Sequence, residues 1–387
     1  MISEVRLQNY MSFGELQRCP LQPITVIVGA NNSGKTNFLS VFDFVRRRGS
    51  DMPQRWHRPI ASDGTLKLEW DVEFPGRDQE GAATGELAKA SYAMQADWAP
   101  KPKRDKSRLT FNEQVTRVRK VFVKHGGVFG TEAPIAMNST GLGSPKVGFA
   151  IFDLPRSHPD QPNMYDVAAA VLPMIGVRSV HLQVPVLRVD NQLAPNASIS
   201  PEGSGLAALV AKWQMEEPEK FQKYNELVDK CLPEMRRVLI KCDQAGMVRL
   251  MFEQQDGERF DSNQVSDGVM IFAGLIAHAI EAPMESILLM EEPERGVHPR
   301  RLLELVDILR TLVHERRVQF IMATHSPALL NVFRDEPEAI LTFRRGPTGT
   351  IVRQLSEMTD IADTLKRSDP GELLSNGVFN EAGTEQP

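Results

Sequence analysis

The chain has 387 residues, 41% of them hydrophobic and 25% charged, which is ordinary for a soluble globular protein with enough length for two domains. No N-terminal signal segment and no apolar run of about 18 residues are present, so the sequence argues against export or a membrane span and favours a cytoplasmic protein. The formal net charge of -5 neither requires nor excludes a nucleic-acid partner. The three cysteines, Cys19, Cys231 and Cys242, lack a C-x-x-C spacing, so we expect a reduced protein without structural zinc.

Two strand patterns open the chain. Residues Ile2–Tyr10 alternate apolar and polar side chains, and the β-branched run Ile24–Val28 predicts a buried strand that we expect to pair near the first. The second strand runs into the sequence GANNSGKT and then into an apolar-periodic segment, which predicts a helix over Thr36–Arg48. This strand–loop–helix order is the setting in which the pattern G-x-x-x-x-G-K-[ST] binds phosphate.

Each residue type in this loop has a chemical reason. Glycines allow backbone N–H groups to turn toward phosphate oxygens, and the new helix presents its positive end to them. Lys35 is placed to reach the β- and γ-phosphates, and the hydroxyl of Thr36 is a suitable ligand for Mg²⁺. We therefore predict nucleotide binding by Asn31, Asn32, Ser33, Gly34, Lys35, Thr36 and Asn37.

The chain changes character after the alternating stretch Thr65–Phe74, which predicts a strand. Residues 76–180 are rich in Gly, Ala and Pro, with strand-like pieces at Val118–Lys124 and Lys146–Phe152, so we predict an inserted smaller lobe. Residues 101–124 hold nine basic side chains against two acidic ones. This run could contact the phosphate backbone of DNA, or it could be a solvated loop, since no aromatic residue interleaves its first part.

Helical and strand patterns alternate in the middle of the chain. Residues Leu206–Val238 have a helical pattern, which Pro218 and Pro233 divide. Strand patterns follow at Val238–Cys242 and Val248–Glu253. The next apolar helix begins at Ser266-Asp267-Gly268, where Ser266 is suited to be the N-cap. A helix start that contains glycine can hold a phosphate, although most capped helices bind nothing, so these residues alone leave both interpretations open.

Two further strand patterns each end in polar residues. The run Ser286–Met290 is followed by Glu291 and Glu292, and the run Val318–Ala323 is followed by Thr324 and His325, with a helix predicted between the two strands over Arg301–Glu315. An acidic pair at the carboxyl end of a core strand can hold Mg²⁺ with one carboxylate and polarise an attacking water with the other, roles that suit Glu291 and Glu292 respectively. His325 falls at the same edge of a parallel sheet, which favours a contact with the γ-phosphate.

The motifs GANNSGKT, Ser266-Asp267-Gly268, ILLMEEPE, RGVHP and ATHSP, in this order, resemble those of the ABC-type ATPase heads of the RecF/SMC/OLD group, especially compact OLD-like ATPases that stand alone. The resemblance covers about residues 1–75 and 180–345. It implies an α/β P-loop NTPase fold of ABC/RecF-like head type, with a mixed central sheet flanked by helices and an inserted smaller lobe. Only 62 residues follow His325, too few for the Toprim domain that OLD nucleases carry.

The resemblance also implies how ATP and Mg²⁺ are bound. In such heads two protomers enclose two ATP molecules, and each ATP contacts the phosphate loop of one protomer and the Ser266–Gly268 helix start of the other. The roles implied for this chain are phosphate and Mg²⁺ binding by Lys35 and Thr36, Mg²⁺ binding by Glu291, catalytic base for Glu292, switch histidine for His325, and a loop to the partner for Arg295–His298.

Two departures from the family pattern affect these expectations, and one family residue has only a candidate. Glu291 stands where the family usually has Asp, so we expect slow turnover. The Ser266-Asp267-Gly268 signature differs from the L-S-G-G-Q of transporters, which together with the large insertion argues against a transporter subunit. The candidate for the family's Q-loop glutamine is Gln183.

We therefore expect residues 1–75 and 181–345 to form the two parts of an ATPase head, residues 76–180 the inserted lobe, and residues 346–387 a C-terminal strand and a flexible tail. The expected function is ATP hydrolysis by a homodimer or higher homo-oligomer that switches a protein effector, a nuclease or toxin, in antiphage defence. Two alternatives remain open. One is a RecF-like repair ATPase that binds DNA through residues 101–124, and the other is a scaffold that uses ATP to oligomerise without hydrolysing it.

Overall fold

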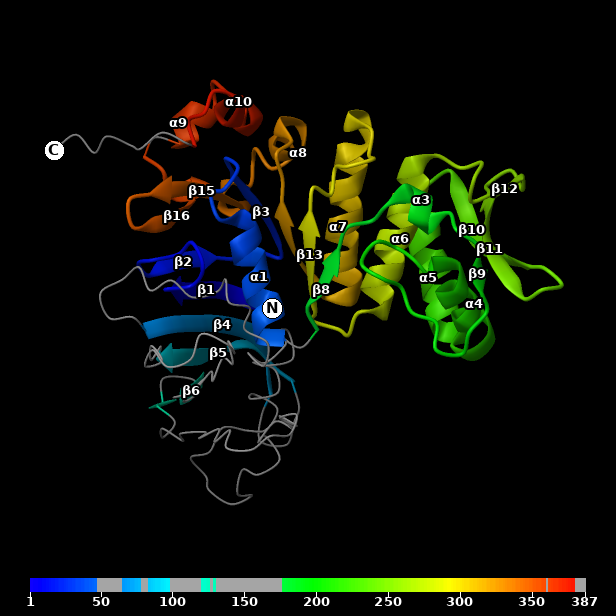
Figure 1. Ribbon diagram of the computed structural model, residues 1–387, viewed down its shortest axis with the longest axis horizontal. Helices are drawn as coiled ribbons and strands as arrows, with labels where there is room; N and C mark the ends of the chain where they lie inside the picture. Colours follow the sequence, from blue (N-terminus) through cyan, green and yellow to red (C-terminus); the bar gives the residue numbers. More distant parts are fainter. Residues whose placement is uncertain are drawn as a thin grey trace, which may run out of the picture.

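The computed structural model describes residues 1–46, 65–77, 83–97, 120–125, 128–129, 176–359 and 361–379, and the structural statements below concern these residues. Their strands form three sheets with helices packed between them (Figure 1). The expected α/β architecture with a mixed central sheet flanked by helices is confirmed.

The central sheet carries the strand that precedes the GANNSGKT loop. Its strands are β16 (Gly349–Gln354), β15 (Ile340–Gly346), β3 (Ile24–Gly29), β14 (Gln319–Ala323), β13 (Ile287–Glu291) and β8 (Arg178–Val180), in this spatial order. All neighbouring pairs are parallel except β15 with β16. Every residue of β3 is buried, which explains its continuous β-branched sequence, because a strand inside a parallel sheet is covered on both faces.

A second, antiparallel sheet contains β1, which was expected to pair near β3. Its strands are β2 (Gln17–Pro20), β1 (Ile2–Gln8), β4 (Thr65–Arg77), β5 (Ala83–Asp97), β6 (Lys120–His125) and β7 (Val128–Phe129), in this spatial order. β1 pairs with β2 and β4, so the expected pairing was wrong. The reason lies in its alternation: Val5 and Leu7 bury one face in the core shared with Phe38 and Phe42 of α1 (Lys35–Arg46), and the other face stays polar.

Two of these strands lie within residues 76–180, the range predicted to be an inserted lobe. β5 pairs with β4, and β6, the strand predicted at Val118–Lys124, pairs with β5, so both continue the sheet begun by β1 and β4. The strand piece predicted at Lys146–Phe152 and residues 101–119 of the basic run lie outside the described residues.

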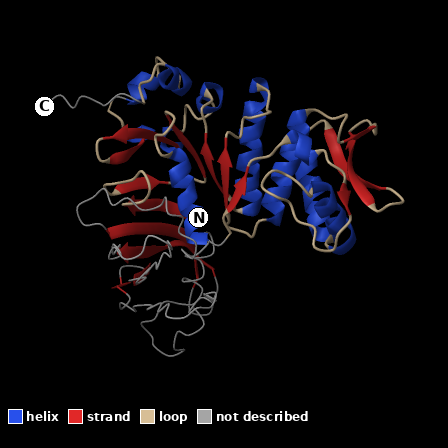
Figure 2. Cartoon of the chain, in the orientation of Figure 1, coloured by secondary structure: helices blue, strands red, loops and turns tan. Residues whose placement is uncertain are grey.

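The third sheet is small and antiparallel and lies at the far end of the molecule from β2 (Figures 1 and 2). It consists of β10 (Met235–Cys242), β11 (Met247–Gln254) and β12 (Arg259–Asp261), with β9 (Asn191–Gln192) pairing to β11. Val238, Leu250 and Phe252 bury its inner face in the core that it shares with α4 (Leu206–Glu216) and α5 (Pro218–Cys231).

These two helices replace the single long helical pattern at Leu206–Val238. The break at Pro218 is confirmed, since α5 begins there with the proline at its first turn. The part after Pro233 was predicted wrongly, because the chain there is already strand β10 from Met235. Proline cannot continue the helix, and the following residues gain ladder hydrogen bonds to β11 instead.

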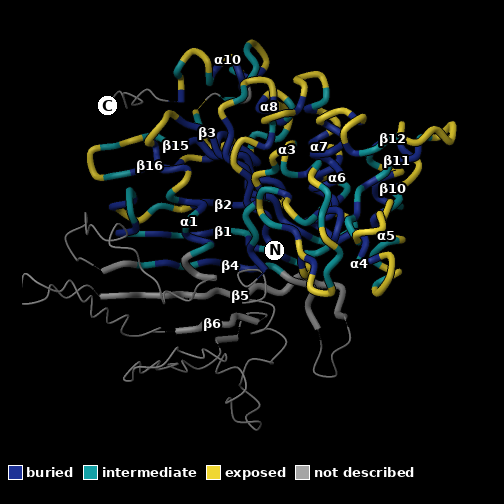
Figure 3. The backbone as a smooth tube through the Cα atoms, turned by 45° about the vertical axis from the view of Figure 1, so that its right-hand side comes forward, coloured by how far each residue is buried: buried dark blue, intermediate teal, exposed yellow. Residues whose placement is uncertain are grey.

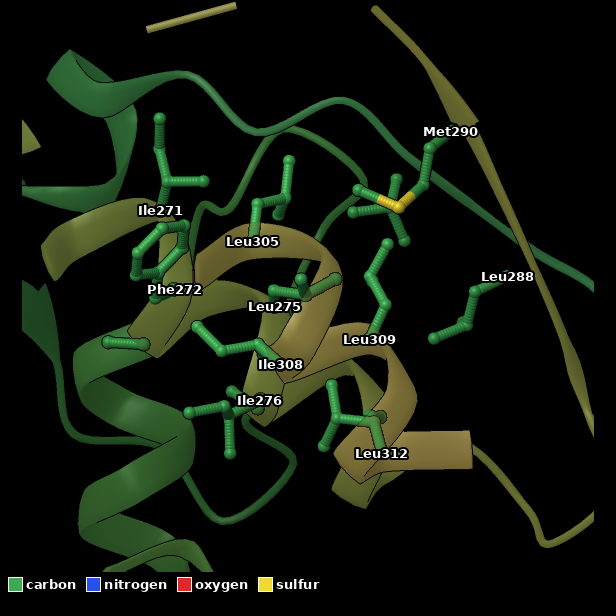
Figure 4. Packing of buried hydrophobic residues seen from close by; sticks show 14 of the residues in the cluster. Ile271, Phe272, Leu275, Ile276, Leu288, Met290, Leu305, Ile308, Leu309 and Leu312 are labelled. Atoms are coloured by element: carbon green, nitrogen blue, oxygen red, sulfur yellow. The ribbon is translucent and has the colours of Figure 1, made fainter. Parts of the chain in front are cut away.

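Helix α7 (Leu302–Arg316) packs between β13 and α6 (Asp267–Glu281), and this layer connects two of the predicted motifs. Figure 4 shows its apolar face meeting α6 on one side and β13 on the other. The labelled side chains are Leu305, Ile308, Leu309 and Leu312 of α7, Ile271, Phe272, Leu275 and Ile276 of α6, and Leu288 and Met290 of β13. Helix α6 is buried almost all round, which fits its largely apolar sequence. In Figure 3, where the backbone is coloured by burial, α6 and α7 lie near the centre of the described part of the molecule.

The C-terminal part adds strand β16 and several short helices. The short helices of this part are α8 (Pro327–Asn331), α9 (Ile361–Leu365) and α10 (Pro370–Ser375), and its 3₁₀ turns are η3 (Pro337–Ala339) and η4 (Leu355–Glu357). The short helix α3 (Val184–Leu187) and the 3₁₀ turn η2 (Pro299–Arg301) occur earlier in the chain. The strand expected after residue 346 is β16, whereas α9 and α10 were not predicted. The end of the expected flexible tail, residues 380–387, lies outside the described residues. Within the described part of the chain, no helix combines the length and apolar character needed to cross a bilayer.

Candidate functional site

The GANNSGKT loop joins β3 to α1, as the sequence predicted. A Cβ atom at Gly29, where φ is +154°, would lie 2.1 Å from the carbonyl oxygen of Phe343 on β15. At Gly34, where φ is +109°, a Cβ would lie 2.3 Å from Oγ1 of Thr350 on β16. Because no side chain fits at these distances, both positions require glycine, and β15 and β16 press directly against the loop and fix its course.

Lys35 is the first residue of α1, and its side chain is folded back onto the loop. Its Nζ donates hydrogen bonds to the carbonyl oxygens of Gly29 at 2.8 Å and Ala30 at 2.9 Å, and the residue is buried. Burial lowers the pKa of Lys35, and the charges of Glu291 and Glu292 oppose this shift. The loop lysine and the acidic pair therefore lie within electrostatic reach of each other, although more than 250 residues separate them.

The remaining predicted loop residues divide into exposed and buried ones. Asn31, Asn32 and Thr36 are exposed, and Asn32 has φ +63°, a left-handed conformation that asparagine tolerates better than most residues. Ser33 is buried, and its Oγ has no hydrogen-bond partner among the described residues. A buried hydroxyl without a partner is unusual in proteins, so an acceptor supplied by a ligand fits its chemistry.

Two residues that the sequence analysis missed, Ser12 and Thr350, form hydrogen bonds that hold the loop in place. The Oγ1 of Thr350 donates to the Ser33 carbonyl oxygen at 2.8 Å and lies 2.8 Å from Oγ of Ser12, and Asn37 Nδ2 donates to the same Ser12 oxygen at 2.8 Å. The amide of Asn37, a predicted nucleotide contact, is thus already engaged within the chain. No local signal could have identified Ser12 or Thr350, because their role exists only where β16 and the turn after β1 meet the loop.

The strand register aligns the acidic pair with this loop. Glu291 on β13 pairs with Ala323 on β14, and Ala323 pairs with Ile27 on β3, so the carboxyl ends of these strands meet at one edge of the sheet. Both Glu291 and Glu292 are exposed at this edge. Glu292 has φ +49°, and its N–H donates to the Ala323 carbonyl oxygen at 2.8 Å. A left-handed glutamate costs about 1–3 kcal/mol, so the loop holds this residue in a strained position next to the site.

His325 follows β14 at the same edge, as predicted, and is exposed. Hydrogen bonds fix the two residues next to it in the chain, Thr324 and Ser326. The hydroxyl of Thr324 donates to Oε1 of Glu294 at 2.6 Å and accepts from the N–H of Ser326 at 2.9 Å, and Ser326 caps α8. The roles of Thr324 and Glu294 were not recognised from the sequence, although both residues lie inside the ATHSP and EEPE motifs.

The signature segment lies at the start of α6. Ser266 is the N-cap, as predicted, and its Oγ accepts from the N–H of Val269 at 3.4 Å, while the Ser266 residue itself is exposed and Gly268 is buried. Arg301, at the end of η2, donates to the same Oγ at 3.4 Å and lies over the Phe272 ring at 5.1 Å from its centroid. Arg301 thus connects the signature helix to the segment that follows the acidic pair.

Two further predicted positions have clear places in the fold. Gln183 is exposed and follows β8, whose Val180 pairs with Met290 of β13, so Gln183 comes after the carboxyl end of the strand next to the acidic pair. In the loop Arg295–His298 the side chain of Val297 is buried, while Arg295 and His298 are exposed.

The sequence matches the AAA_21 family, described as "AAA domain, putative AbiEii toxin, Type IV TA system", over residues 24–122 and 185–331. No curated protein matches the chain. A solved structure titled as an SmcHead bound to the C-winged helix domain of ScpA shares the fold, with a TM-score of 0.50 and 10% identity over 91% of this chain and 97% of that one.

Two other solved structures are similar at lower scores. The SMC head domain from Thermotoga maritima has a TM-score of 0.46 and 10% identity over 91% of this chain and 98% of that one. An Smc head domain with an extended coiled coil, bound to the C-terminal domain of ScpA derived from Pyrococcus furiosus, has a TM-score of 0.46 and 12% identity over 95% of this chain and 99% of that one.

Proposed function

Because the chain belongs to the AAA_21 family of AAA domains and has the fold of an ABC-type ATPase head of the RecF/SMC type, we propose that it hydrolyses ATP in a site that two copies of the chain complete together. The observation that carries this proposal is the alignment of three strand ends. Lys35, the pair Glu291 and Glu292, and His325 follow β3, β13 and β14, whose register brings them to one edge of the sheet.

The fold supports a site shared between two copies. β13 lies two strand positions from β3, which is about 10 Å at the usual strand spacing. Helix α6 packs on the side of α7 away from the central sheet (Figure 1), so a helix layer lies between α6 and the sheet. Ser266, at the start of α6, is exposed, which suits a contact with the loop of a second copy.

The residues of the site suit the chemistry of phosphoanhydride hydrolysis. Phosphate oxygens of ATP are held by Lys35, by the loop N–H groups and by the Ser33 hydroxyl, which has no partner among the described residues. Ser266 and Gly268 of a second copy contact the γ-phosphate. Thr36 and Glu291 would hold Mg²⁺, which when bound offsets the charge of the phosphates. Water attacks the γ-phosphorus as the bond to the ADP oxygen breaks, and Glu292 accepts the proton that the water loses.

Turnover in this scheme drives a cycle of association and release. We propose that the two heads associate while ATP is bound and separate after hydrolysis, and that a partner effector, a nuclease or toxin, responds to this change in antiphage defence. The family description, "putative AbiEii toxin, Type IV TA system", is consistent with a place in a toxin–antitoxin system. Binding of DNA through residues 101–124, most of which lie outside the described residues, and a purely scaffolding role remain alternative predictions.

The experiment combines phosphate release with the oligomeric state measured by light scattering. Wild-type protein should release phosphate from ATP, Glu292→Gln should retain ATP and accumulate as a dimer with hydrolysis at least about 100-fold slower, and Lys35→Ala should bind no nucleotide. The exposed Glu219→Gln on α5 is the matched control and should behave like the wild type. ATP-dependent oligomers without hydrolysis in the wild type would favour the scaffold, and unchanged turnover in Glu292→Gln would remove that residue from its role.

A further inference from the structure

The loop after the acidic pair and the turn that carries His325 are joined by one buried hydroxyl. Oγ1 of Thr324 donates to Oε1 of Glu294 at 2.6 Å and accepts from the N–H of Ser326 at 2.9 Å. Thr324 is 0% exposed, so water does not compete for either hydrogen bond. The side chain of Thr324 therefore uses both its donor and an acceptor site to hold the residues on either side of the histidine.

The backbone of the same residue reaches the phosphate-loop strand. The N–H of Thr324 donates to the carbonyl oxygen of Ile27 on β3 at 3.1 Å, two residues before Gly29. The N–H of Glu292 donates to Ala323, the residue just before Thr324, at 2.8 Å. Thr324 is thus the point where β3, the acidic loop and the histidine turn are connected.

His325 itself has no such support. Its imidazole is exposed and makes no hydrogen bond within the described part of the chain. The position of the ring is consequently set by the backbone turn, and the turn is set by its neighbours. Ser326 adds to this by accepting the Leu329 N–H at 3.2 Å as the cap of α8.

We propose that Glu294 is a positioning residue that acts on His325 through the hydroxyl of Thr324. The inference rests on the proposed function, because it presumes that His325 contacts the γ-phosphate. The bridge keeps the histidine turn in register with Glu292, since Glu294 and Glu292 belong to the same loop and Thr324 adjoins His325. A shift of one of these segments without the other would misalign the base and the histidine on the reacting phosphate, and a misplacement of about 1 Å can cost about 100-fold in rate.

Only one of the two carboxylate oxygens of Glu294 takes part. Oε1 accepts from Thr324, whereas Oε2 is buried without a hydrogen-bond partner among the described residues. Glutamine at this position keeps an oxygen acceptor for the hydroxyl, and alanine removes it. The pair of variants therefore separates loss of the hydrogen-bonded bridge from loss of the carboxylate charge.

The test measures ATP turnover, the KM for ATP and the thermal midpoint for four single variants. Thr324→Val and Glu294→Ala should lower kcat by roughly 10- to 100-fold and change the KM less than about threefold, while Thr324→Ser and Glu294→Gln stay within about threefold of the wild type. The double variant Glu294→Ala/Thr324→Val should be no slower than either single variant, because both changes remove one bridge.

A second set of variants asks whether the bridge acts through the histidine. In a His325→Ala background, adding Glu294→Ala should lower kcat no further, whereas a general loss of packing would lower it again. A wild-type rate in Thr324→Val, a Thr324→Ser variant as slow as Thr324→Val, or a further loss in the His325→Ala background would each overturn the proposal. If Glu294→Gln is as slow as Glu294→Ala, an oxygen acceptor for the Thr324 hydroxyl is not sufficient, and the positioning role is also overturned.

The outcome stays distinguishable from failure of the proposed function. Absence of hydrolysis in the wild type and in the Glu219→Gln control would defeat the ATPase proposal itself. Hydrolysis that is lost in Glu292→Gln but intact in Thr324→Val would defeat only the bridge. If Thr324→Val does not fold, the same test can be made with Glu294→Ala, because the Glu294 side chain is partly exposed. The conservative variants Thr324→Ser and Glu294→Gln then serve as its controls.

Discussion

Single residues show where the chain accepts a local cost near the site. Glu292 holds a left-handed backbone conformation next to the sheet edge, and Lys35 is buried with its ammonium hydrogen-bonded to two carbonyl oxygens. Burying a charged amine is costly, and the two loop carbonyls together with the nearby glutamates reduce that cost. Such costs concentrate where a ligand interacts, which is why these residues are the most informative ones for function.

Gly29 gives a direct test of how tightly β15 presses on the loop. Gly29→Ala should destabilise the fold by at least about 3 kcal/mol and abolish nucleotide binding, because its Cβ would overlap the Phe343 carbonyl oxygen. Gly257→Ala is the matched control, with φ +88° and nothing within 4 Å of the added atom, and should cost only about 1–2 kcal/mol. Denaturant unfolding and nucleotide titration measure both. Equal losses in the two variants would contradict the close approach.

His278 predicts how stability depends on pH. The residue is 2% exposed on α6, and burial, followed by the charge of Arg178, lowers the pKa of His278 to about 4 from an ordinary value of 6.5. Above pH 6.5 the histidine is neutral in both the folded and unfolded states. As the pH falls toward 4, the unfolded state binds the proton first, so stability is lost, by about 2 kcal/mol at pH 5.

The measurement is the free energy of unfolding at pH 7.5 and pH 5. His278→Leu should remove this part of the pH dependence, whatever its effect on absolute stability. The exposed Leu303→Ala on α7, which removes no titratable group, is the control and should leave the pH dependence as in the wild type. A pH dependence that is unchanged in His278→Leu would contradict the assignment.

Among the elements, α7 has the widest structural role. Its apolar face packs on both α6 and β13, and Arg301 just before it hydrogen-bonds to Ser266, so the helix connects the acidic loop with the signature segment. Because Arg301 follows the acidic loop closely in the chain, a displacement of that loop should be passed through Arg301 to the start of α6. This connection gives a physical route between the two half-sites that the proposed arrangement assigns to one chain.

Leu309 tests the packing of this layer. Leu309 is 0% exposed between α6 and β13, and Leu309→Ala should destabilise the protein by about 3 kcal/mol through the lost burial and the cavity left behind. Leu303 on the same helix is 61% exposed, and Leu303→Ala should change stability by less than about 0.5 kcal/mol. Chemical denaturation of both variants decides the matter, and a small effect of Leu309→Ala would show that the layer repacks easily.

For the whole molecule, the main question is whether two copies complete each site. In the proposed arrangement one copy supplies Lys35 and the other Ser266, so a variant damaged in one half-site retains the other half-site intact. The expected consequence is complementation between two inactive proteins, which a site contained within one chain could not show.

The complementation test mixes Lys35→Ala with Ser266→Asp. Aspartate keeps the N-cap of α6 but places a negative charge where a phosphate would lie, so each variant alone should be inactive. A mixture should regain part of the wild-type rate of phosphate release, because one composite site then has both intact halves. Ser266→Asn, a neutral N-cap, is the control for the added charge and should be less impaired than Ser266→Asp. No gain at any mixing ratio would contradict the shared site.

Much of this fold could be predicted because the signals are local. The strand, loop and helix around Lys35, the N-cap at Ser266 and the strands before Glu291 and His325 follow from side-chain periodicity and capping chemistry within short windows. Predictions failed where a choice depended on distant partners. The residues after Pro233 form strand β10 because they pair with β11 through backbone hydrogen bonds. Strand β1 pairs with β4 and so belongs to a different sheet from β3.

The sequence by itself determined which chemical groups the protein carries: a phosphate loop, an acidic pair, a histidine turn and a capped helix start. Only the tertiary structure decided how these groups relate to one another. Strand register brings the phosphate loop, the acidic pair and the histidine turn to one edge of the central sheet. The capped helix start belongs to α6, which packs on the other side of α7. Contacts between distant segments give roles to Ser12, Thr350, Glu294 and Arg301. The physical reason is that periodicity and capping act over a few residues, whereas register and packing are fixed only when the whole chain has folded.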